Sequence, residues 1–368
     1  MRKRRFLSIL PFVLVLVLAA AAIAVMSSTN YRLKSSVLSG GGTSMESANY
    51  KMTSTLGQST ATGQLSSSSY TNYAGFWYTI ETAGLVLDTL AIDFGTLGLY
   101  TYDGTSWGRI NGRDPNGLAS YDGKLIANFP TVGLYEYDGS WQKLNPNDGQ
   151  QAMCGVGSNL YVDFGAGLGL YEYDGAWKKI NNNQPENMIA LGSDLVVDFG
   201  SGVGLYKYDG TWKMLNDNDA EGMCEVGTDL YVYFTGVGLY RYDGSWQKIN
   251  NNQPENMLAL GTELIVDFGA GIGLYKYDGT WQRLNPNDAV SMCAVGSDLY
   301  VYFSGVGLYK YDGSWKRINP NQPENMLALG SDLVVDFGSG IGLYKYDGSN
   351  WSRVNPNDCE DMIATNLP

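Results

Sequence analysis

Short stretches of alternating apolar and polar residues, separated by glycine-rich turns, fill most of the chain. Near residue 200 this alternation predicts four strands, at 188–191, 195–199, 204–208 and 212–215. Asp209-Gly210 suits a two-residue hairpin turn, which needs positive φ. Four such strands and their connections leave no room for a helix within one unit of the pattern. The pattern therefore predicts an all-β protein.

The same unit recurs eight times from about residue 83 onward. Each copy contains Tyr-Asp-Gly followed two or three residues later by tryptophan, and successive copies are 34 to 36 residues apart. The glycines are Gly104, Gly139, Gly175, Gly210, Gly244, Gly279, Gly313 and Gly348, and the tryptophans are Trp107, Trp141, Trp177, Trp212, Trp246, Trp281, Trp315 and Trp351. We expect these tryptophans to fill the gaps between outer strands.

A four-stranded unit is marginal alone and has two faces to cover, so successive units must stack on each other. Closing the stack into a ring removes its exposed ends. We therefore predict that residues 81–368 form an eight-bladed β-propeller of four-stranded blades, without helices. Residues 361–367 resemble the first strand of a ninth unit, with Met362 at the methionine position. We expect this segment to complete the first blade.

The repeat resembles two known kinds of propeller repeat. Its Gly-Leu-Tyr-x-Tyr-Asp-Gly-x-Trp core, seen from Gly204 to Trp212, is similar to a bacterial regulator-type repeat, and its length is similar to that of tectonin-type lectin repeats. The regulator family's W-x-G-T segment is replaced here by Val-Asp-Phe-Gly, and the Asn- and Pro-rich loops depart from tectonin. The second resemblance implies sugar binding only at the level of the family.

The N-terminus has the layout of an export signal. Four basic residues precede an apolar run that ends in small residues, so we predict a signal peptide over residues 1–26, cleaved near Ala24. A retained membrane anchor is the alternative. Residues 27–80 are rich in Ser, Thr, Gly and Tyr, and we predict a small β-rich module there. Its YxLxxSVLxxGG, SxNYxLxxTxGQ and YAGFW motifs resemble a module of secreted bacterial proteins. We expect a secreted or cell-surface protein, extracellular or periplasmic.

Charge and composition restrict the function. The formal net charge of −13 makes nucleic acid and anionic lipid poor partners. The chain has no histidine, which removes the commonest general base and the commonest metal ligand. Cys154, Cys224 and Cys293 recur in equivalent apolar contexts, so we predict free, buried thiols on innermost strands.

The repeats alternate in a way that suggests a site. The units that contain Met188, Met257 and Met326 carry Gln-Pro-Glu-Asn before the first strand and Val-Asp-Phe-Gly at the end of the second. Propeller topology brings these two loops to one face. The candidate ligand-binding residues are Glu186, Asn187, Asp198, Glu255, Asn256, Asp267, Glu324, Asn325 and Asp336. Such groups hydrogen-bond sugar hydroxyls, and calcium could use the same oxygens, although no cofactor is required by the sequence. For the aspartates, capping of the following turn is the simpler interpretation.

Three functions remain open. We favour a multivalent binding module, with glycan as ligand, because repeated weak sites on one ring raise avidity. A structural or protein-docking surface protein is the alternative. An enzyme is the least favoured, because near-copies without histidine offer no unique catalytic constellation. We expect a monomer that meets a membrane only through an uncleaved N-terminal segment.

Overall fold

The computed structural model describes residues 27–28, 31–32, 42–47, 50–55, 63–66, 71–74, 89–147 and 152–367. The predicted signal segment, 1–26, lies outside these residues. The chain divides into two compact units, Met1–Gly84 and Leu85–Pro368. No helix in the described part of the chain is long and apolar enough to cross a membrane.

The described strands of the first unit form three antiparallel pairs. They are β1 (Ser27–Ser28) with β2 (Tyr31–Arg32), β3 (Gly42–Ser47) with β4 (Tyr50–Thr55), and β5 (Gly63–Ser66) with β6 (Thr71–Ala74).

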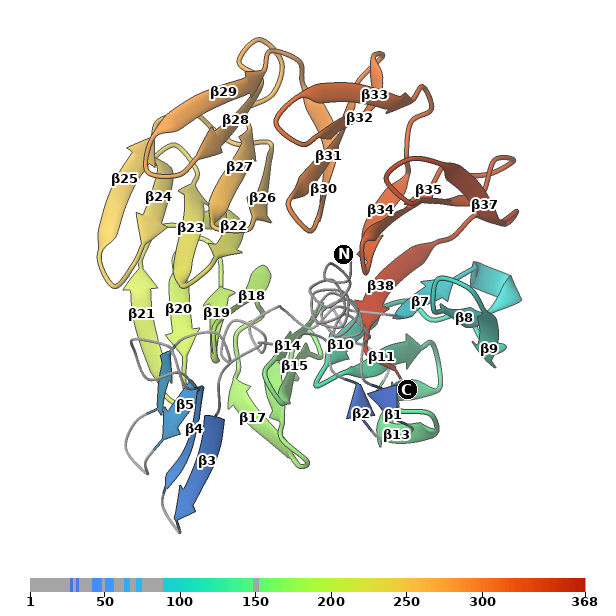
Figure 1. The fold of residues 1–368 in the computed structure, drawn as a ribbon. Helices are drawn as coiled ribbons and strands as arrows, with labels where there is room; N and C mark the ends of the chain where they lie inside the picture. The colour runs from blue at the N-terminus through green and yellow to red at the C-terminus, as the bar shows by residue number, and fades with distance from the viewer. Residues whose placement is uncertain are drawn as a thin grey trace, which may run out of the picture. The chain divides into compact units, whose positions relative to one another are not determined.

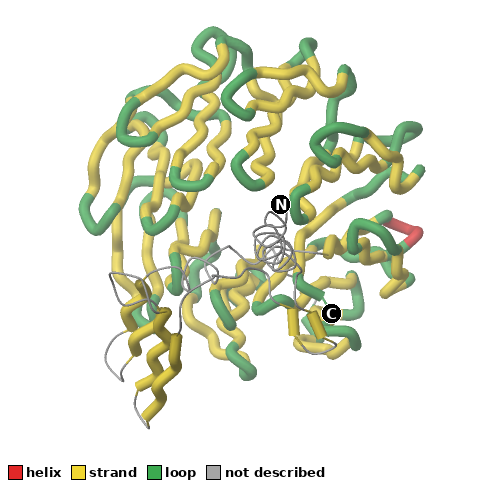
Figure 2. Tube along the Cα trace, in the orientation of Figure 1, coloured by secondary structure: helices red, strands yellow, loops and turns green. Residues whose placement is uncertain are grey.

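The second unit is an eight-bladed β-propeller, as predicted, and each blade is a four-stranded antiparallel sheet (Figures 1 and 2). From the innermost strand outward, blade 1 is β38 (Asp361–Thr365), β7 (Thr89–Asp93), β8 (Leu99–Tyr102) and β9 (Trp107–Asn111). Blade 2 is β10 (Leu118–Tyr121), β11 (Lys124–Phe129), β12 (Gly133–Tyr137) and β13 (Trp141–Asn145). Blade 3 is β14 (Ala152–Val156), β15 (Asn159–Asp163), β16 (Leu170–Tyr173) and β17 (Trp177–Asn181). Blade 4 is β18 (Asn187–Leu191), β19 (Asp194–Asp198), β20 (Leu205–Tyr208) and β21 (Trp212–Asn216).

The remaining blades repeat this order. Blade 5 is β22 (Ala220–Val226), β23 (Asp229–Phe234), β24 (Gly238–Tyr242) and β25 (Trp246–Asn250). Blade 6 is β26 (Asn256–Leu260), β27 (Glu263–Asp267), β28 (Leu274–Tyr277) and β29 (Trp281–Asn285). Blade 7 is β30 (Ala289–Val295), β31 (Asp298–Phe303), β32 (Gly307–Tyr311) and β33 (Trp315–Asn319). Blade 8 is β34 (Asn325–Leu329), β35 (Asp332–Asp336), β36 (Leu343–Tyr346) and β37 (Trp351–Asn355).

The two ends of the propeller meet in blade 1. The C-terminal strand β38 pairs antiparallel with β7, with Met362 opposite Ile92 and Thr365 opposite Thr89, and β38 also contacts the innermost strands of blades 2 and 8. Figure 1 shows the red β38 beside the cyan β7. The predicted closure by the C-terminal segment is therefore confirmed.

One detail of the prediction is wrong, because the described propeller contains a single short helix. A 3₁₀ turn, η1 (Gly95–Leu97), connects β7 to β8 and is drawn red in Figure 2. The corresponding loop of blade 4 reads Phe-Gly-Ser-Gly-Val-Gly, whereas blade 1 has Phe-Gly-Thr-Leu-Gly. Two successive i→i+3 hydrogen bonds, from the N–H of Leu97 to the Phe94 carbonyl (3.2 Å) and from the N–H of Gly98 to the Gly95 carbonyl (2.7 Å), make this loop a 3₁₀ turn. The equally short loops of blades 5 and 7 make one such bond each.

The core lies between neighbouring blades. The second strand of each blade is apolar on both faces because another blade covers each side, and Leu195, Val196 and Val197 of β19 are all fully buried. The tryptophans join outer strands, as predicted. Trp212 Nε1 donates a hydrogen bond of 2.9 Å to the carbonyl oxygen of Ile180 in the preceding blade. Equivalent bonds are made by Trp141, Trp177, Trp246, Trp281, Trp315 and Trp351.

The four cysteines are free, as predicted for three of them. Cys224 and Cys293 are buried on the innermost strands β22 and β30. Cys154 on β14 is only half-buried, which differs from the prediction.

Candidate functional site

One face of the propeller carries the blade-to-blade connections and the loops between second and third strands. We call it the connection face. In blade 4 the backbone holds the two loops together, because the N–H of Glu186 donates a 2.8 Å hydrogen bond to the carbonyl oxygen of Asp198. The same 2.8 Å bond recurs at Glu255, Glu324 and Glu360 in blades 6, 8 and 1. The paired loops therefore place a glutamate beside the aspartate that ends the second strand.

A third acid completes each of these arrangements. It comes from the connection to the next blade, at the fourth position of an Asn-x-x-Asp segment. In each group, ligand oxygens of all three carboxylates lie within 4.8 Å of one another. We call these groups carboxylate triads. They are Glu186/Asp198/Asp219 in blade 4, Glu255/Asp267/Asp288 in blade 6, Glu324/Asp336/Asp358 in blade 8 and Glu360/Asp93/Asp114 in blade 1.

The central aspartate of each triad is buried. Asp198 and Asp267 are fully buried, and burial raises the pKa of both to about 6, with the neighbouring carboxylates adding to the rise. Burial also raises the pKa of Asp93 to about 7 and raises that of Asp336. None of the ion pairs in the described part of the chain involves a triad carboxylate. Each triad therefore concentrates negative charge without an ion-paired side chain.

Of the three aspartates predicted to cap the following turn, Asp336 does so, and Asp93 of blade 1 makes the same bond. Asp336 accepts a 3.1 Å hydrogen bond from the N–H of Gly338, and Asp93 accepts a 3.0 Å bond from Gly95. Asp198 and Asp267 differ, because neither carboxylate oxygen of either residue has a hydrogen-bond partner. The N–H groups of Gly200 and Ala220 are close enough to lower the pKa of Asp198, but they do not reach hydrogen-bond geometry, and burial outweighs them.

Each triad glutamate lies over a glycine of the adjacent loop. A Cβ atom on Gly200 would overlap the Glu186 carboxylate, and Gly269 and Gly338 stand in the same relation to Glu255 and Glu324. Gly200 also has a φ of +74°, which favours glycine. The glycine of the Asp-Phe-Gly segment thus leaves space for the glutamate to turn toward the buried aspartate.

The nine predicted site residues come together on the connection face, but in two environments. The glutamates are exposed, and so are Asn187 and Asn256, whereas Asn325 is half-buried and the three aspartates are fully buried. A ligand outside the ring would therefore meet glutamates and asparagines first. Sequence analysis missed the third acid of each triad and the whole triad of blade 1. The recurring Asn-x-x-Asp spacing was the available signal.

A pocket opens on this face between blades 4, 5 and 6. Its volume is about 510 Å³. Five polar side chains, two methionines and a buried tyrosine line it; the polar ones include Glu221, which sequence analysis also missed. Glu221 accepts hydrogen bonds from Gln253 (3.1 Å) and Thr235 (2.8 Å). The side chains are Asn187, Glu221, Gln253, Glu255, Asn256, Met223, Met257 and Tyr233.

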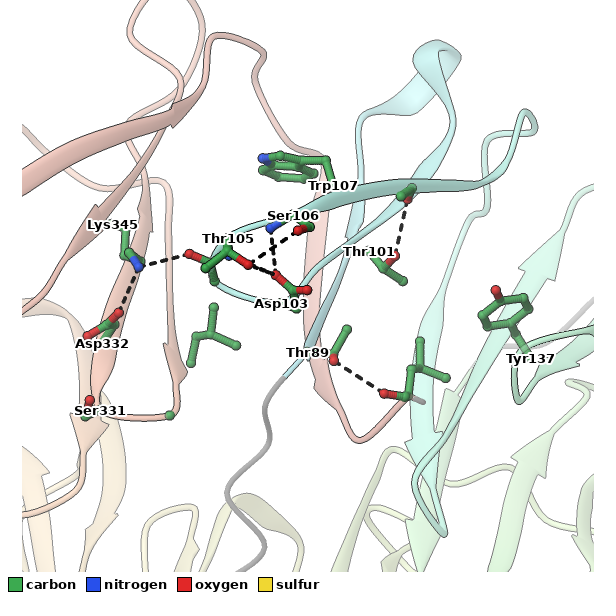
Figure 3. Close-up of a pocket in the computed structure, with 15 residues that line it drawn as sticks. Thr89, Thr101, Asp103, Thr105, Ser106, Trp107, Tyr137, Ser331, Asp332 and Lys345 are labelled. Atoms are coloured by element: carbon green, nitrogen blue, oxygen red, sulfur yellow. Dashed lines mark hydrogen bonds and ion pairs between the residues drawn. The ribbon is translucent and has the colours of Figure 1, made fainter. Parts of the chain in front are cut away.

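A second pocket, of about 800 Å³, lies on the opposite face among blades 8, 1 and 2 (Figure 3). Its charged groups already have partners. Figure 3 shows Lys345 between Asp332, at 3.1 Å, and the carbonyl oxygen of Gly104, at 3.0 Å. Asp103 accepts hydrogen bonds from Thr105 and Ser106 of its own turn. The unpaired carboxylates therefore favour the connection face as the candidate site.

No protein-family model and no curated protein matches the chain. Among solved structures, two of AztD from Citrobacter koseri, one in the apo form, are similar in fold. They align with TM-scores of 0.53 and 0.52 at 11% and 12% sequence identity, covering 74% of this chain and 96% of theirs. These similarities support the propeller fold and carry no activity over to this chain.

Proposed function

We propose that this protein is an exported, multivalent binding module that recognises carbohydrate on its connection face. The pocket between blades 4, 5 and 6 carries the proposal, because it gathers two carboxylates and three amides beside apolar side chains. Its volume of about 510 Å³ falls within the range of small-molecule sites, roughly 300–1,000 Å³.

The chemistry of the lining suits a polyhydroxylated ligand. Each sugar hydroxyl both donates and accepts hydrogen bonds, so it needs acceptors and donors close together. Glu221 and Glu255 supply acceptors, and the amides of Asn187, Asn256 and Gln253 supply both. The bonds from Gln253 and Thr235 hold Glu221 in place before a ligand arrives, which lowers the entropic cost of binding.

The repeat makes the proposed binding multivalent. Blades 6, 7 and 8 carry the same loops, with Glu324 and Asn325 in the positions of Glu255 and Asn256. Val290 takes the place of Glu221 there and is 48% exposed. The two copies therefore differ in one carboxylate, and a weaker second site on the same rigid ring would still add avidity. We propose a monomer that acts outside the cytoplasm, with the acidic chain avoiding nucleic acid.

A glycan array probed with the chain lacking residues 1–26 tests this proposal. The array should yield a bound glycan, and Glu221→Val, which copies blade 7, should weaken binding to it by at least about tenfold, a change typical of losing one charged hydrogen-bond partner. The matched control Val290→Thr should bind as the unaltered protein does. Failure to bind any glycan would overturn the proposal and favour the alternative of a protein-docking surface. Equal binding by Glu221→Val would place the site elsewhere on the ring.

A further inference from the structure

We propose that the carboxylate triads of blades 4 and 6 each bind one divalent cation of the calcium class. The two sites are Glu186/Asp198/Asp219 and Glu255/Asp267/Asp288. This inference goes beyond carbohydrate binding and does not depend on which ligand the pocket takes.

The spacing of the acids fits one ion. Calcium takes carboxylate oxygens at 2.3–2.6 Å, so two oxygens on the same ion lie no further apart than about 5 Å. In each triad one oxygen from every carboxylate lies within 4.8 Å of the other two. Three negative charges at this separation repel one another unless a cation lies between them. The loops hold them together through the backbone bond between Glu186 and Asp198, and through its copy in blade 6.

The second observation is the central aspartate. Asp198 and Asp267 are fully buried, and all four of their carboxylate oxygens lack a hydrogen-bond partner. Buried polar groups in proteins almost always have a partner, and an exception commonly marks a bound water or ion. The nearby N–H groups do not reach hydrogen-bond geometry, and the two neighbouring acids cannot donate when ionised, so a cation is the partner that would satisfy these oxygens.

The donor set selects the class of ion. All three side chains of each site offer hard oxygen ligands, which suit calcium, magnesium and manganese better than zinc or copper. Imidazole is absent from the chain, and the cysteine nearest to a triad is Cys359 in blade 8. Cys359 donates from its Sγ to Asp336 Oδ2 at 3.3 Å, so that aspartate already has a partner. We therefore expect weaker binding in blade 8.

Blade 5 provides an internal comparison. Glu221 occupies there the position of Glu186, but Tyr233 replaces the buried aspartate and Gln253 replaces the third acid. Glu221 instead accepts hydrogen bonds from Gln253 and Thr235. In blade 5, where the other two acids are missing, the glutamate at this position accepts hydrogen bonds from neighbouring donors. In a complete triad the glutamate lies beside two other acids.

The test is a calcium titration of the full chain after a chelator has removed bound ions, followed by calorimetry and by terbium luminescence. The calcium concentration should reach about 5 mM, because extracellular calcium modules bind with Kd values of roughly 10⁻⁴–10⁻³ M. Asp219→Asn should remove one bound ion or weaken its binding at least tenfold, and Asp219→Asn/Asp288→Asn should remove two. Glu221→Gln is the matched control and should keep the full stoichiometry. Glu255 is the one triad residue of blades 4 and 6 that also lines the carbohydrate pocket, and neither substituted aspartate does, so failure of the calcium test leaves the glycan test unaffected.

Thermal unfolding separates ion binding from a structural role of the acids. Asp219→Asn should unfold at the same or a higher temperature than the unaltered protein in chelator, because one repelling charge is gone, and at a lower temperature in calcium. A variant that is destabilised equally in both conditions, or an unaltered chain that binds no calcium or terbium, would overturn the proposal.

Discussion

A pair of glycines in one loop offers a quantitative test of how the glutamate reaches its triad. Gly200 and Gly202 have similar positive φ values, +74° and +83°. Alanine in the left-handed region costs roughly 1–2 kcal/mol at either position. Only Gly200 lies under Glu186, and the three atoms nearest to a Cβ there all belong to the Glu186 carboxylate. Nothing lies within 4 Å of a Cβ on Gly202.

The expected difference depends on calcium. Without the ion, the exposed end of Glu186 can swing away from an alanine, so Gly200→Ala and Gly202→Ala should agree within about 0.5 kcal/mol in their free energies of unfolding. At a calcium concentration tenfold above Kd, one site adds about 1.4 kcal/mol to the stability of the folded state. Gly202→Ala should keep this gain and Gly200→Ala should lose it.

Urea unfolding with and without calcium measures both free energies. The account is refuted if the two variants gain the same stability from calcium, because Glu186 would then not be a ligand. A cost of Gly200→Ala that exceeds that of Gly202→Ala by more than about 1 kcal/mol in chelator would also refute it, since the contact would then be structural.

Three further predictions concern the ring itself. Burial raises the pKa of Cys224 from near 9 to about 11, so Cys224 in the native protein at pH 8 should not react with a thiol reagent until the chain unfolds. The stability that its neutral thiol contributes should be lost between about pH 9 and 11. Rapid labelling of Cys224 itself in the native chain at pH 8, located by peptide mapping, would contradict this. Trp212→Phe should lower the free energy of unfolding by about 1–3 kcal/mol, because the carbonyl of Ile180 loses its donor, and an unchanged urea midpoint would argue against the bond. Deleting residues 361–368 should open blade 1 and lower the unfolding temperature by well over 5 °C, because β7 loses its inner neighbour and the apolar cluster around Met362 is exposed. A truncated chain that is equally stable would show that the ring does not depend on this closure.

The fold was predictable because the same turn and strand signals recur in all eight units. Tyr-Asp-Gly-x-Trp marks the hairpin before every outer strand, and the predicted strands of blade 4 agree with the observed ones to within one residue at each end. The closure of the ring by the strand that contains Met362 was also predictable. This segment resembles the first strand of a ninth unit, and only blade 1 is left for it to join. The exception was η1, because the apolar pattern does not distinguish this five-residue loop from the loops of blades 5 and 7, which form no 3₁₀ turn.

The site was only partly predictable. Glu186 stands out because turn chemistry alone does not require a glutamate before the innermost strand, whereas Asp198 was a candidate that turn capping could equally explain. Asp219 was overlooked, since an aspartate in an Asn-rich connection has the composition of an ordinary turn. Its neighbours on the folded ring come from loops 21 and 33 residues away in sequence, and only the stacking of strands reveals that three acids converge.

The most direct measurement is an anomalous difference map from crystals of the full chain grown with manganese, which occupies hard oxygen sites and scatters anomalously. The account predicts a peak between Glu186, Asp198 and Asp219 and a second at the equivalent place in blade 6. Water or empty space at both positions, with manganese bound elsewhere or not at all, would contradict it.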